Sequence, residues 1–311
     1  MLETTSSLAS SVRDYTYENG RRYHAYRHGQ YPMPNDEQEQ DRQELFHHIC
    51  RLLTGGEMFR APITAAGTPL PSAQRIRILD MGTGTGLWPM DMAEDFPQAE
   101  ILGTDLSPIQ PVFVPPNCRF YVDDLESEWT YPPAEAFDYI HGRSLAGGIA
   151  DWPKLVGQAY THLNPGGWFE LQEFEARITS DDGTHLQSPL LREWLDKLEF
   201  SSQKFGKPVM NVAANLASMM HQAGFVNITN EIYKCPIGSW PKNPRLKEIG
   251  QVAKLALLEA VESYSLALFT RVLGQSAEEA LEFVSRVRSE ILRNTYHMYV
   301  RFYYVYGQRP E

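Results

Sequence analysis

Short apolar runs alternate with amphipathic segments from residue 75 onward. The runs are rich in β-branched and aromatic residues and are bounded by Gly, Pro, Asn or Asp, which is typical of buried strands. The segments between them repeat apolar residues at helical spacing, and strands alternating with helices indicate an α/β fold with a parallel sheet. The expected strands are 76–80, 100–105, 119–122, 137–141, 168–173, 225–233 and 298–306, and the expected helices are 87–95, 151–163 and 211–223.

The chain before this core changes character twice. Residues 13–36 are dense in Tyr and basic side chains, which fits either a solvated basic helix or a segment that contacts something else. A helix follows over 37–53, capped by Asn35 or Asp36, and then a loop containing Gly and Pro. The expected organisation is a disordered Ser/Thr-rich tail over 1–12, an N-terminal helical cap and linker over 13–74, and one α/β domain over 75–311.

Two helical insertions interrupt the core, at about 185–206 and 242–295. Their apolar residues recur at helical spacing, so both are predicted to be amphipathic. Such helices can pack on the sheet, cover a substrate, or form the face of a homodimer or of a contact with a regulatory protein. The sequence leaves these alternatives open.

The first expected strand ends in Asp80 and runs into a turn with three alternate glycines, Gly82, Gly84 and Gly86. Glycine lets the chain turn sharply and lets a ligand lie against the backbone, beside the positive N-terminal end of the next helix. A dinucleotide-binding turn needs its third glycine where this chain has Leu87. A carboxylate at Asp80 would repel a pyrophosphate but can pair with the ammonium group of an amino-acid tail. S-adenosylmethionine (SAM) has that tail and no phosphate, so the pattern favours SAM over a turn that serves packing alone.

Carboxylates also follow the next two expected strands. Asp105 lies about 20 residues after the last glycine, where a carboxylate that binds ribose hydroxyls is expected. Asp123 or Asp124 can accept a hydrogen bond from the adenine amino group, unless this segment is only an acidic turn. The spacing of these acids therefore supports a nucleoside site at the ends of the first three strands.

Charge and cysteine content narrow the partners. The 311 residues include 28 basic and 39 acidic side chains, for a formal net charge of −11, which argues against nucleic acid. No apolar stretch is long enough to cross a membrane, and the N-terminus lacks the features of a signal peptide. Cys50, Cys118 and Cys235 have no metal-type spacing. We expect a cytoplasmic protein, with the nucleus as the alternative, that binds no metal, no nucleic acid and no membrane.

These motifs resemble the class I SAM-dependent methyltransferases and, within them, the fungal LaeA-like group. The Asp-x-Gly-x-Gly-x-Gly turn and Asp105 match the family pattern. The resemblance is weak between residues 180 and 297. It implies a Rossmann-like, seven-stranded sheet, mostly parallel with an antiparallel last strand and with helices on both faces. The phrases typical of the group are YENGRRY (17–23), PNDE (34–37), LSPIQP (106–111), VPPN (114–117), FDYIHGR (137–143) and LNPGGW (163–168).

The resemblance also implies SAM as the methyl donor, with S-adenosylhomocysteine as product, and favours Asp124 over Asp123 at the adenine. His141 ends the fourth expected strand, beyond which ligands of open α/β sheets bind, and a neutral imidazole suits a general base. His141 is therefore the candidate catalytic residue, unless its ring only bonds backbone or lines the SAM tail. The residues expected to bind the cofactor are Tyr23, Asp80, Gly82, Gly84, Gly86, Asp105, Leu106, Asp123, Asp124, Leu125 and His141.

Aromatic residues of the N-terminal segment can cover the cofactor, because aromatic rings attract a sulfonium through cation–π contact. The candidates are Tyr15, Tyr17, Tyr23 and Tyr31, and the alternative is that they pack on the core. We expect methyl transfer to O or N of a small secondary metabolite. The alternatives are a LaeA-like regulator that methylates proteins or itself, and a SAM-binding scaffold that controls secondary metabolism.

Overall fold

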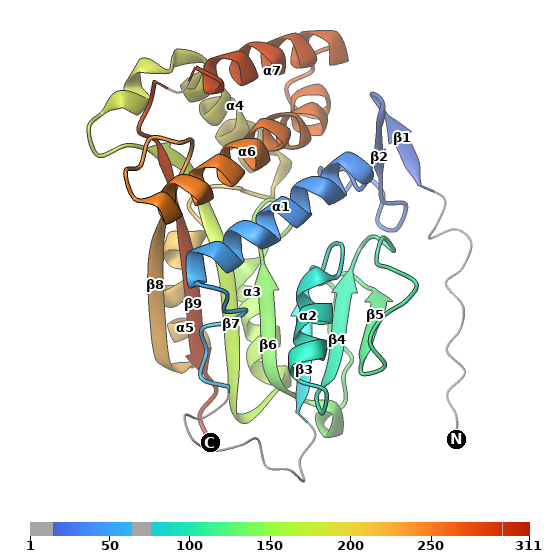
Figure 1. The fold of residues 1–311 in the computed structure, drawn as a ribbon. Helices are drawn as coiled ribbons and strands as arrows, with labels where there is room; N and C mark the ends of the chain where they lie inside the picture. Colours follow the sequence, from blue (N-terminus) through green and yellow to red (C-terminus); the bar gives the residue numbers. More distant parts are fainter. Residues whose placement is uncertain (1–14, 64–75, 294) are drawn as a thin grey trace.

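Seven strands form one sheet in the order β5-β4-β3-β6-β7-β9-β8 (Figure 1). The computed structural model describes residues 15–63, 76–293 and 295–311. β9 runs antiparallel to both of its neighbours, and the other strands of the sheet are parallel to one another. The predicted sheet, mostly parallel with an antiparallel last strand, is confirmed. Its strands are β3 (Arg77–Met81), β4 (Glu100–Asp105), β5 (Cys118–Val122), β6 (Phe137–Arg143), β7 (Leu163–Thr179), β8 (Val226–Pro236) and β9 (Tyr299–Gln308).

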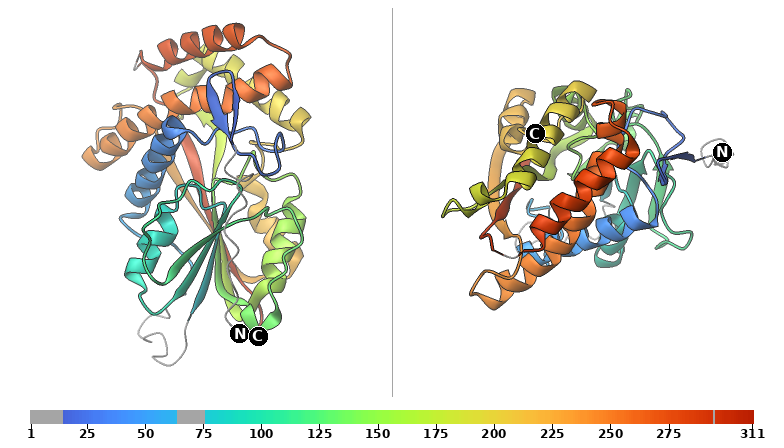
Figure 2. Two further views of the ribbon diagram at one scale, coloured as in Figure 1. Left: turned by 90° about the vertical axis from the view of Figure 1, so that its right-hand side faces the viewer. Right: turned by 90° about the horizontal axis from the view of Figure 1, so that it is seen from above.

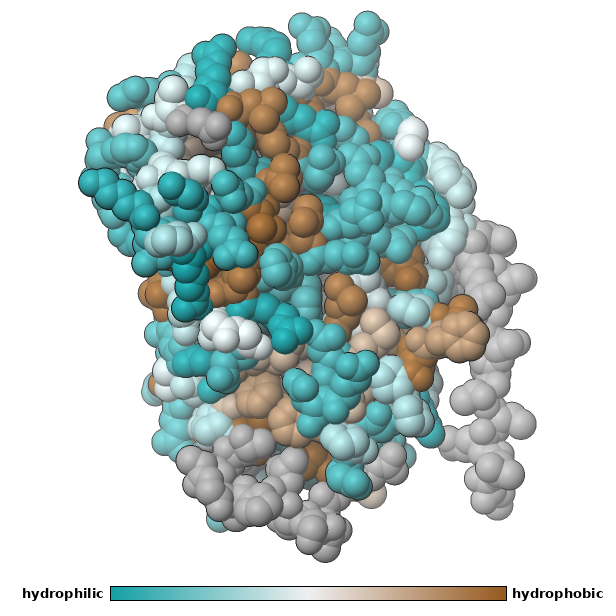
Figure 3. Space-filling view, in the orientation of Figure 1, coloured by the Kyte–Doolittle hydropathy of each residue, from teal (hydrophilic) through white to brown (hydrophobic). Residues whose placement is uncertain are grey.

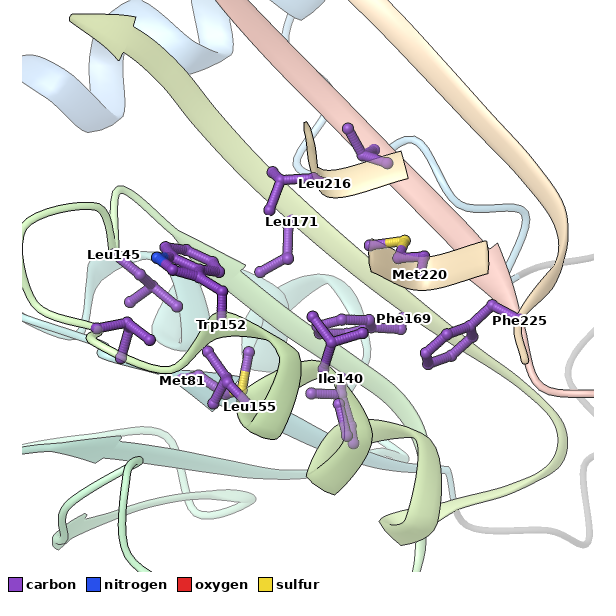
Figure 4. Close-up of a cluster of buried hydrophobic side chains, with 14 of the residues drawn as sticks. Met81, Ile140, Leu145, Trp152, Leu155, Phe169, Leu171, Leu216, Met220 and Phe225 are labelled. Carbon is purple, nitrogen blue, oxygen red and sulfur yellow. The ribbon is translucent and has the colours of Figure 1, made fainter. Parts of the chain in front are cut away.

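Both faces of the sheet are covered by helices (Figure 2). Successive strand residues point to opposite faces, so an uninterrupted apolar run buries residues on both sides. Ile78 and Tyr139 pack on the side of α2, whereas Leu79 and Ile140 pack on the other side. Figure 4 shows this second core, in which strand residues such as Phe169 meet the helices behind them. The covering helices are α1 (Glu37–Thr54) and α2 (Leu87–Asp95) on one face, and α3 (Trp152–His162) and α5 (Leu216–Ala223) on the other.

A further layer of helices lies beyond the carboxyl ends of the parallel strands (Figure 1). Its members share an apolar core that includes Leu198, Val261 and Phe283. Side-chain caps fix two of the helix starts: Asn243 accepts from a backbone N–H, and Ser276 forms a capping box. The predicted helical character of both insertions is confirmed. We call this group the helical layer; it consists of α4 (Pro189–Phe205), α6 (Pro244–Arg271) and α7 (Ala277–Ile291).

The segment before α1 contains a hairpin, so the basic helix, one of the two alternatives for residues 13–36, is wrong for the described part of this segment. β1 (Thr16–Glu18) pairs antiparallel with β2 (Arg21–Tyr23). Asn19 and Gly20 form the turn with φ of 51° and 80°, and positive φ at both positions is what a two-residue hairpin turn requires. The Asn-Gly pair was therefore the local signal for a hairpin. The many basic residues around it favoured the interpretation of this segment as a basic helix instead.

Ion pairs attach the hairpin to the helices around it. The Arg21 guanidinium bonds Asp36 Oδ2 at 2.6 Å and Glu262 Oε1 of α6 at 3.0 Å. Asp36 also accepts from the backbone N–H of Glu39 as the N-cap of α1, which confirms one of the two predicted caps. The expectation that this segment contacts something is thus confirmed, and its partner is the helical layer.

Other expectations concern the N-terminal tail, the linker, membrane-spanning segments and the cysteines. The disordered tail predicted over 1–12 and the linker residues 64–74 lie outside the described residues. Within the described part, no helix has the length and apolar character needed to span a membrane. All three cysteines are buried free thiols.

Candidate active site

The turn after β3 requires glycine for two reasons. All three glycines have a positive φ, which residues with a side chain rarely adopt: 63° at Gly82, 56° at Gly84 and 82° at Gly86. A Cβ at these positions would also overlap the side chains of Leu145, Gln43 and Phe120, in that order. Sequence reasoning explained the glycines by a ligand lying on the backbone, and the structure adds close packing by three neighbouring elements.

Asp105 ends β4 and faces this turn. Its carboxylate accepts from the backbone N–H of Gly84 at 2.9 Å and of Ser107 at 2.8 Å. Burial raises the pKa of Asp105 to about 6, against the opposing effect of these two donors. The predicted acid and the glycine turn are therefore hydrogen-bonded to each other, which fixes the turn and orients the carboxylate.

Two cavities adjoin Asp105. The first, which we call the polar cavity, is lined by most of the residues predicted for the cofactor's amino-acid end. The second, the acidic cavity, is lined by the residues predicted for the adenine end. Of the predicted residues, Asp80, Gly82, Gly84, Asp105 and His141 line the polar cavity, and Gly82, Asp105, Leu106, Asp123, Asp124 and Leu125 line the acidic cavity.

The two candidate adenine acids differ in how they are held. The Asp124 carboxylate accepts from the backbone N–H of Glu126 and the hydroxyl of Ser127, each at 3.0 Å, and lies 3.4 Å from Arg27. The Asp123 side chain is exposed and accepts from the backbone N–H of Asp124 at 2.8 Å. Asp124 is thus the better-positioned acid, and both remain predictions for the adenine.

Asp80 and His141 form one unit that sequence reasoning treated as two separate residues. They are register partners on β3 and β6, and Asp80 Oδ1 accepts from His141 Nδ1 at 2.7 Å. The imidazole is fully buried and stacks on Trp88, with ring centroids 3.8 Å apart and planes 6° apart. Its Nε2 has no hydrogen-bond partner within the described residues. When Nδ1 donates to Asp80, a neutral ring keeps its lone pair on Nε2.

The four tyrosines proposed to cover the cofactor separate clearly. Only Tyr31 lines the polar and acidic cavities. Tyr23 lines neither; it is buried under the guanidinium of Arg271, 4.9 Å from the ring centroid, and burial raises its pKa to about 12. The Tyr15 hydroxyl bonds the backbone at Pro108, and Tyr17 is exposed. Tyrosine content alone could not distinguish these positions, because the contacts of each ring depend on how the segment packs on the rest of the fold.

Gly86 also lines neither cavity. It is the N-cap residue of α2, in the left-handed conformation. Its role in the site is therefore to start the helix, and Tyr23 and Gly86 are the two predicted cofactor residues that the structure keeps away from the cavities.

An ion pair on α1 was missed by sequence reasoning. Arg42 Nε and Nη2 donate to the two carboxylate oxygens of Glu39 at 2.9 and 2.6 Å, and both side chains are buried. The two residues line the polar cavity, and Arg42 also lines a third cavity described below. A Glu-x-x-Arg pair on the apolar side of an amphipathic helix was the available signal, because charged residues rarely lie on a buried face without a partner.

A second cation reaches the polar cavity from the end of β6. Arg143 Nη2 donates to His47 Nδ1 at 2.9 Å, so His47 Nε2 carries the proton and donates to Asp91 Oδ2 at 3.1 Å. Burial and the nearby Arg143 both lower the pKa of His47. His47 is therefore neutral and holds the guanidinium in place.

The loop after β6 is held by a buried acid. Glu173 of β7 accepts from the backbone N–H of Leu145 at 2.5 Å and of Ala146 at 3.3 Å. Burial raises its pKa to about 8, against the effect of these donors. The loop supplies Ser144, Leu145 and Ile149 to the cavities, so Glu173 shapes the site without lining it.

A third cavity, which we call the apolar cavity, lies between the sheet and the helical layer. It is lined by α1, α4, α6 and the strands β7, β8 and β9, with side chains such as Phe174, Trp194 and Leu198. It shares Arg42, Phe46 and Tyr264 with the polar cavity. The helical insertions thus form one wall of the apolar cavity, which adjoins the predicted cofactor site.

Comparison with known proteins places this geometry in context. A family model described as a methyltransferase domain matches residues 40–230. The chain is 42% identical over 306 residues to the methyltransferase pytC of Aspergillus terreus, covering 98% of this chain and 91% of pytC. It is 35% identical over 310 residues to the secondary metabolism regulator laeA of Aspergillus fumigatus, covering 99% of this chain and 80% of that one.

The chain is also similar to proteins of known structure. The chain is similar to phosphoethanolamine N-methyltransferase 2 of Haemonchus contortus, in complex with S-adenosyl-L-methionine, at 19% identity and a TM-score of 0.46. The match covers 78% of this chain and 50% of that one.

Within the described residues, no group of three or more His, Cys, Asp or Glu side chains is arranged to hold a metal ion.

Proposed function

Since the chain belongs to the methyltransferase family and is a SAM-dependent methyltransferase, we propose that it methylates an oxygen or nitrogen atom of a small secondary metabolite. One observation carries this proposal. A cavity lined by polar groups meets a cavity lined by apolar side chains at Arg42, Phe46 and Tyr264. The first suits a charged donor, the second suits an apolar acceptor, and the shared side chains mark where the two would meet.

The polar and acidic cavities fit SAM, and we assign them as its site. Asp105 is oriented by two backbone donors and keeps further lone pairs for ribose hydroxyls. Leu106 and Leu125 offer apolar surface to the adenine, with Asp124, or Asp123, for its amino group. Asp80 and Arg143 offer opposite charges to the zwitterionic amino-acid tail. When bound, SAM supplies an electrophilic methyl group, and the residues of the chain orient the reactants and exclude water.

The lining of the apolar cavity favours a small, mainly apolar acceptor. Its walls come from the sheet below and from the helical layer above, and its lining includes the buried residues Leu198, Ala253 and Ala256. The similarity to pytC, which is named a methyltransferase, agrees with an enzyme that transfers a methyl group.

Two roles for His141 stay predictions. As a general base, its Nε2 would take the acceptor's proton, with Asp80 fixing the tautomer. As a wall of the cofactor site, the pair would only shape the polar cavity. His141→Ala separates the roles: loss of a base lowers kcat about 10²–10⁴-fold at saturating SAM, whereas loss of a wall weakens SAM binding and leaves kcat nearly normal.

A regulatory role is the second candidate. The chain is similar over almost its full length to laeA proteins, which are named regulators of secondary metabolism. In Figure 3 apolar residues form a broken stripe over the helical layer. Leu255 and Leu281 of this layer, and Leu292 directly after α7, are large exposed apolar residues. Such a surface suits a homodimer or a regulatory protein partner. It would serve methylation of proteins, automethylation, or a scaffold that binds SAM without turnover.

Incubation with SAM labelled with tritium on its methyl group distinguishes these functions. The protein is mixed with a small-molecule extract of a filamentous fungus, and label is counted in the organic phase and in protein. We expect label in the organic phase. Label on the chain or on added protein would favour the regulatory candidate, and SAM binding without label in either fraction would favour a scaffold. If calorimetry detects no SAM binding, the proposed function is wrong.

A further inference from the structure

Arg42 occupies an unusual position between the two cavities. It lies on α1, its side chain is 7% exposed, and it lines both the polar and the apolar cavity. Glu39 binds its Nε and Nη2, whereas Nη1 has no hydrogen-bond partner within the described part of the chain. The guanidinium carbon lies 5.7 Å from the ring centroid of Tyr264, which lines the same two cavities. One N–H-bearing nitrogen of a buried cation is thus left for a ligand at the junction.

The lining of the apolar cavity makes this cation informative. Among the described residues that line it, Arg42 is the one charged side chain and Tyr264 the one with a hydroxyl. Burying a guanidinium beside apolar walls is costly unless it is paired and hydrogen-bonded. A purely apolar acceptor would be served equally well by an apolar residue at position 42. The position therefore indicates an acceptor with a complementary negative group at one end.

A second cation is available for the anion of the cofactor. Arg143 lines the polar cavity alone, where His47 holds it. SAM carries one carboxylate, so one guanidinium in the polar cavity is enough to pair with it. Arg42, which reaches into the apolar cavity as well, is then left to face the acceptor.

We propose that the acceptor is a mainly apolar small molecule with an acidic hydroxyl, such as a phenol, an enol or a carboxylic acid, and that it binds as the anion with its oxygen at Nη1 of Arg42. This inference rests on the proposed function and narrows it from O or N to an ionised oxygen. A guanidinium stabilises an oxygen anion by a charge-assisted hydrogen bond. Arg42 is then a specificity-determining residue of the acceptor site.

The chemistry balances without a base. A lone pair of the oxygen anion forms the new O–CH₃ bond while the S–CH₃ bond breaks, and its electron pair stays on sulfur. The positive charge on sulfur and the negative charge on oxygen are both neutralised by the transfer. Because the acceptor binds already ionised, no proton has to be removed during the reaction. His141 is then a wall of the cofactor site.

Two fluorescent probes that differ by one charge test the inference without knowledge of the natural acceptor. Anilinonaphthalene sulfonate is an apolar aromatic anion, and phenylnaphthylamine is its uncharged parent. Both are titrated into the protein with saturating S-adenosylhomocysteine, so that the cofactor site is filled. We expect the sulfonate to bind at least about tenfold tighter than its parent, as a charge-assisted hydrogen bond implies.

The variants are chosen to keep the fold. Removing Arg42 alone would leave Glu39 buried and unpaired, so the test variant is Glu39→Gln/Arg42→Met, which removes both charges. It is expected to lose about ten- to a hundredfold in sulfonate affinity while affinity for the neutral parent changes less than about twofold. Arg286→Met, at an exposed position of α7, is the matched control and should change neither. Ala260→Phe, which fills part of the apolar cavity, should weaken both probes.

Calorimetry with SAM on the same variants separates the inference from the function. Because Glu39 and Arg42 also line the polar cavity, we expect Glu39→Gln/Arg42→Met to lose some SAM affinity, but less than the loss in sulfonate affinity. If its SAM affinity falls tenfold while probe discrimination persists, Arg42 serves the cofactor carboxylate, and the inference is wrong although the function stands. Probe binding that Ala260→Phe leaves unchanged also overturns the inference. Failure of the native protein to bind SAM contradicts the proposed function instead.

Discussion

The polar cavity and the apolar cavity meet at three side chains but are built in opposite ways. One wall of the polar cavity comes from the ends of β3, β4 and β6 and the turns that follow them, which fix residues such as Asp105, and α1 supplies much of the rest. The apolar cavity comes from four helices and strands on the side of the helical layer, α1, β7, α4 and α6, together with β8 and β9, and its lining residues lie far apart in the chain. The contrast teaches that the acids and glycines expected to bind the donor are positioned by local turn geometry, whereas the cavity proposed for the acceptor is formed by the packing of the helical insertions on the sheet.

The largest expected effect lies at the junction of the two cavities. Arg42→Met alone leaves the Glu39 carboxylate buried without its partner, and we expect a loss of about 3–5 kcal/mol in the free energy of unfolding. Glu39→Gln/Arg42→Met should recover most of this loss, because no uncompensated charge remains. Denaturant unfolding of both variants measures the difference. If the single variant is as stable as the double one, the pair is not buried as described and the boundary between the cavities is wrong.

The polar cavity is tested most directly at Asp105. Asp105→Ala removes a charge-assisted hydrogen bond to the ribose, worth about 1.5–3 kcal/mol, so SAM affinity should fall about ten- to a hundredfold. Binding of the neutral probe in the apolar cavity should stay the same. Calorimetry and fluorescence titration on one sample measure both quantities. Equal losses in both would show that the two cavities are not separable, and an unchanged SAM affinity would remove Asp105 from the site.

The protonation of Asp105 gives the polar cavity a pH dependence that the apolar cavity should lack. Burial raises the pKa of Asp105 to about 6, so the carboxyl is mostly ionised at pH 7 and mostly protonated at pH 5. Ribose hydroxyls donate to the ionised form, and SAM affinity should therefore fall as the pH is lowered through about 6. Calorimetry at several pH values measures this. In Asp105→Asn, which does not titrate, the fall should be reduced, and a fall of the same size in that variant would point to another group.

The smallest expected effect distinguishes two tyrosines of the N-terminal segment. Tyr31→Leu should weaken SAM binding by about threefold, as loss of a contact worth about 0.5–1 kcal/mol implies, because Tyr31 lines both cofactor cavities. Tyr23→Leu should leave SAM affinity unchanged, because Tyr23 lies under Arg271 instead. Both substitutions remove the same phenol ring and introduce the same side chain. Equal effects would mean that the hairpin acts on the site as a whole.

The predictability of the site follows the same division. The glycine turn, Asp105 and the acids after β5 follow strands whose apolar runs are unambiguous, so sequence reasoning could place them in one region. The pairing of Asp80 with His141 could not be foreseen, because it depends on the register between β3 and β6. The apolar cavity depends on how α1 meets α6, for which no local pattern exists, whereas the Glu39–Arg42 pair had a local signal in its i,i+3 spacing on α1. The Asn-Gly turn of the hairpin was readable and was outweighed by the basic residues around it.

The place of β9 in the sheet has a consequence for how the chain acquires its structure during synthesis. β8 leaves the ribosome well before β9, with the whole of α6 and α7 between them, yet β9 lies between β7 and β8. Until it arrives, β7 has an open edge and β8 has no neighbour to pair with, and such unpaired strands invite association with other chains. The helices that roof the apolar cavity emerge during this interval. A nascent chain that stalls there exposes β7 and β8 together, so we expect this step to depend most on chaperones.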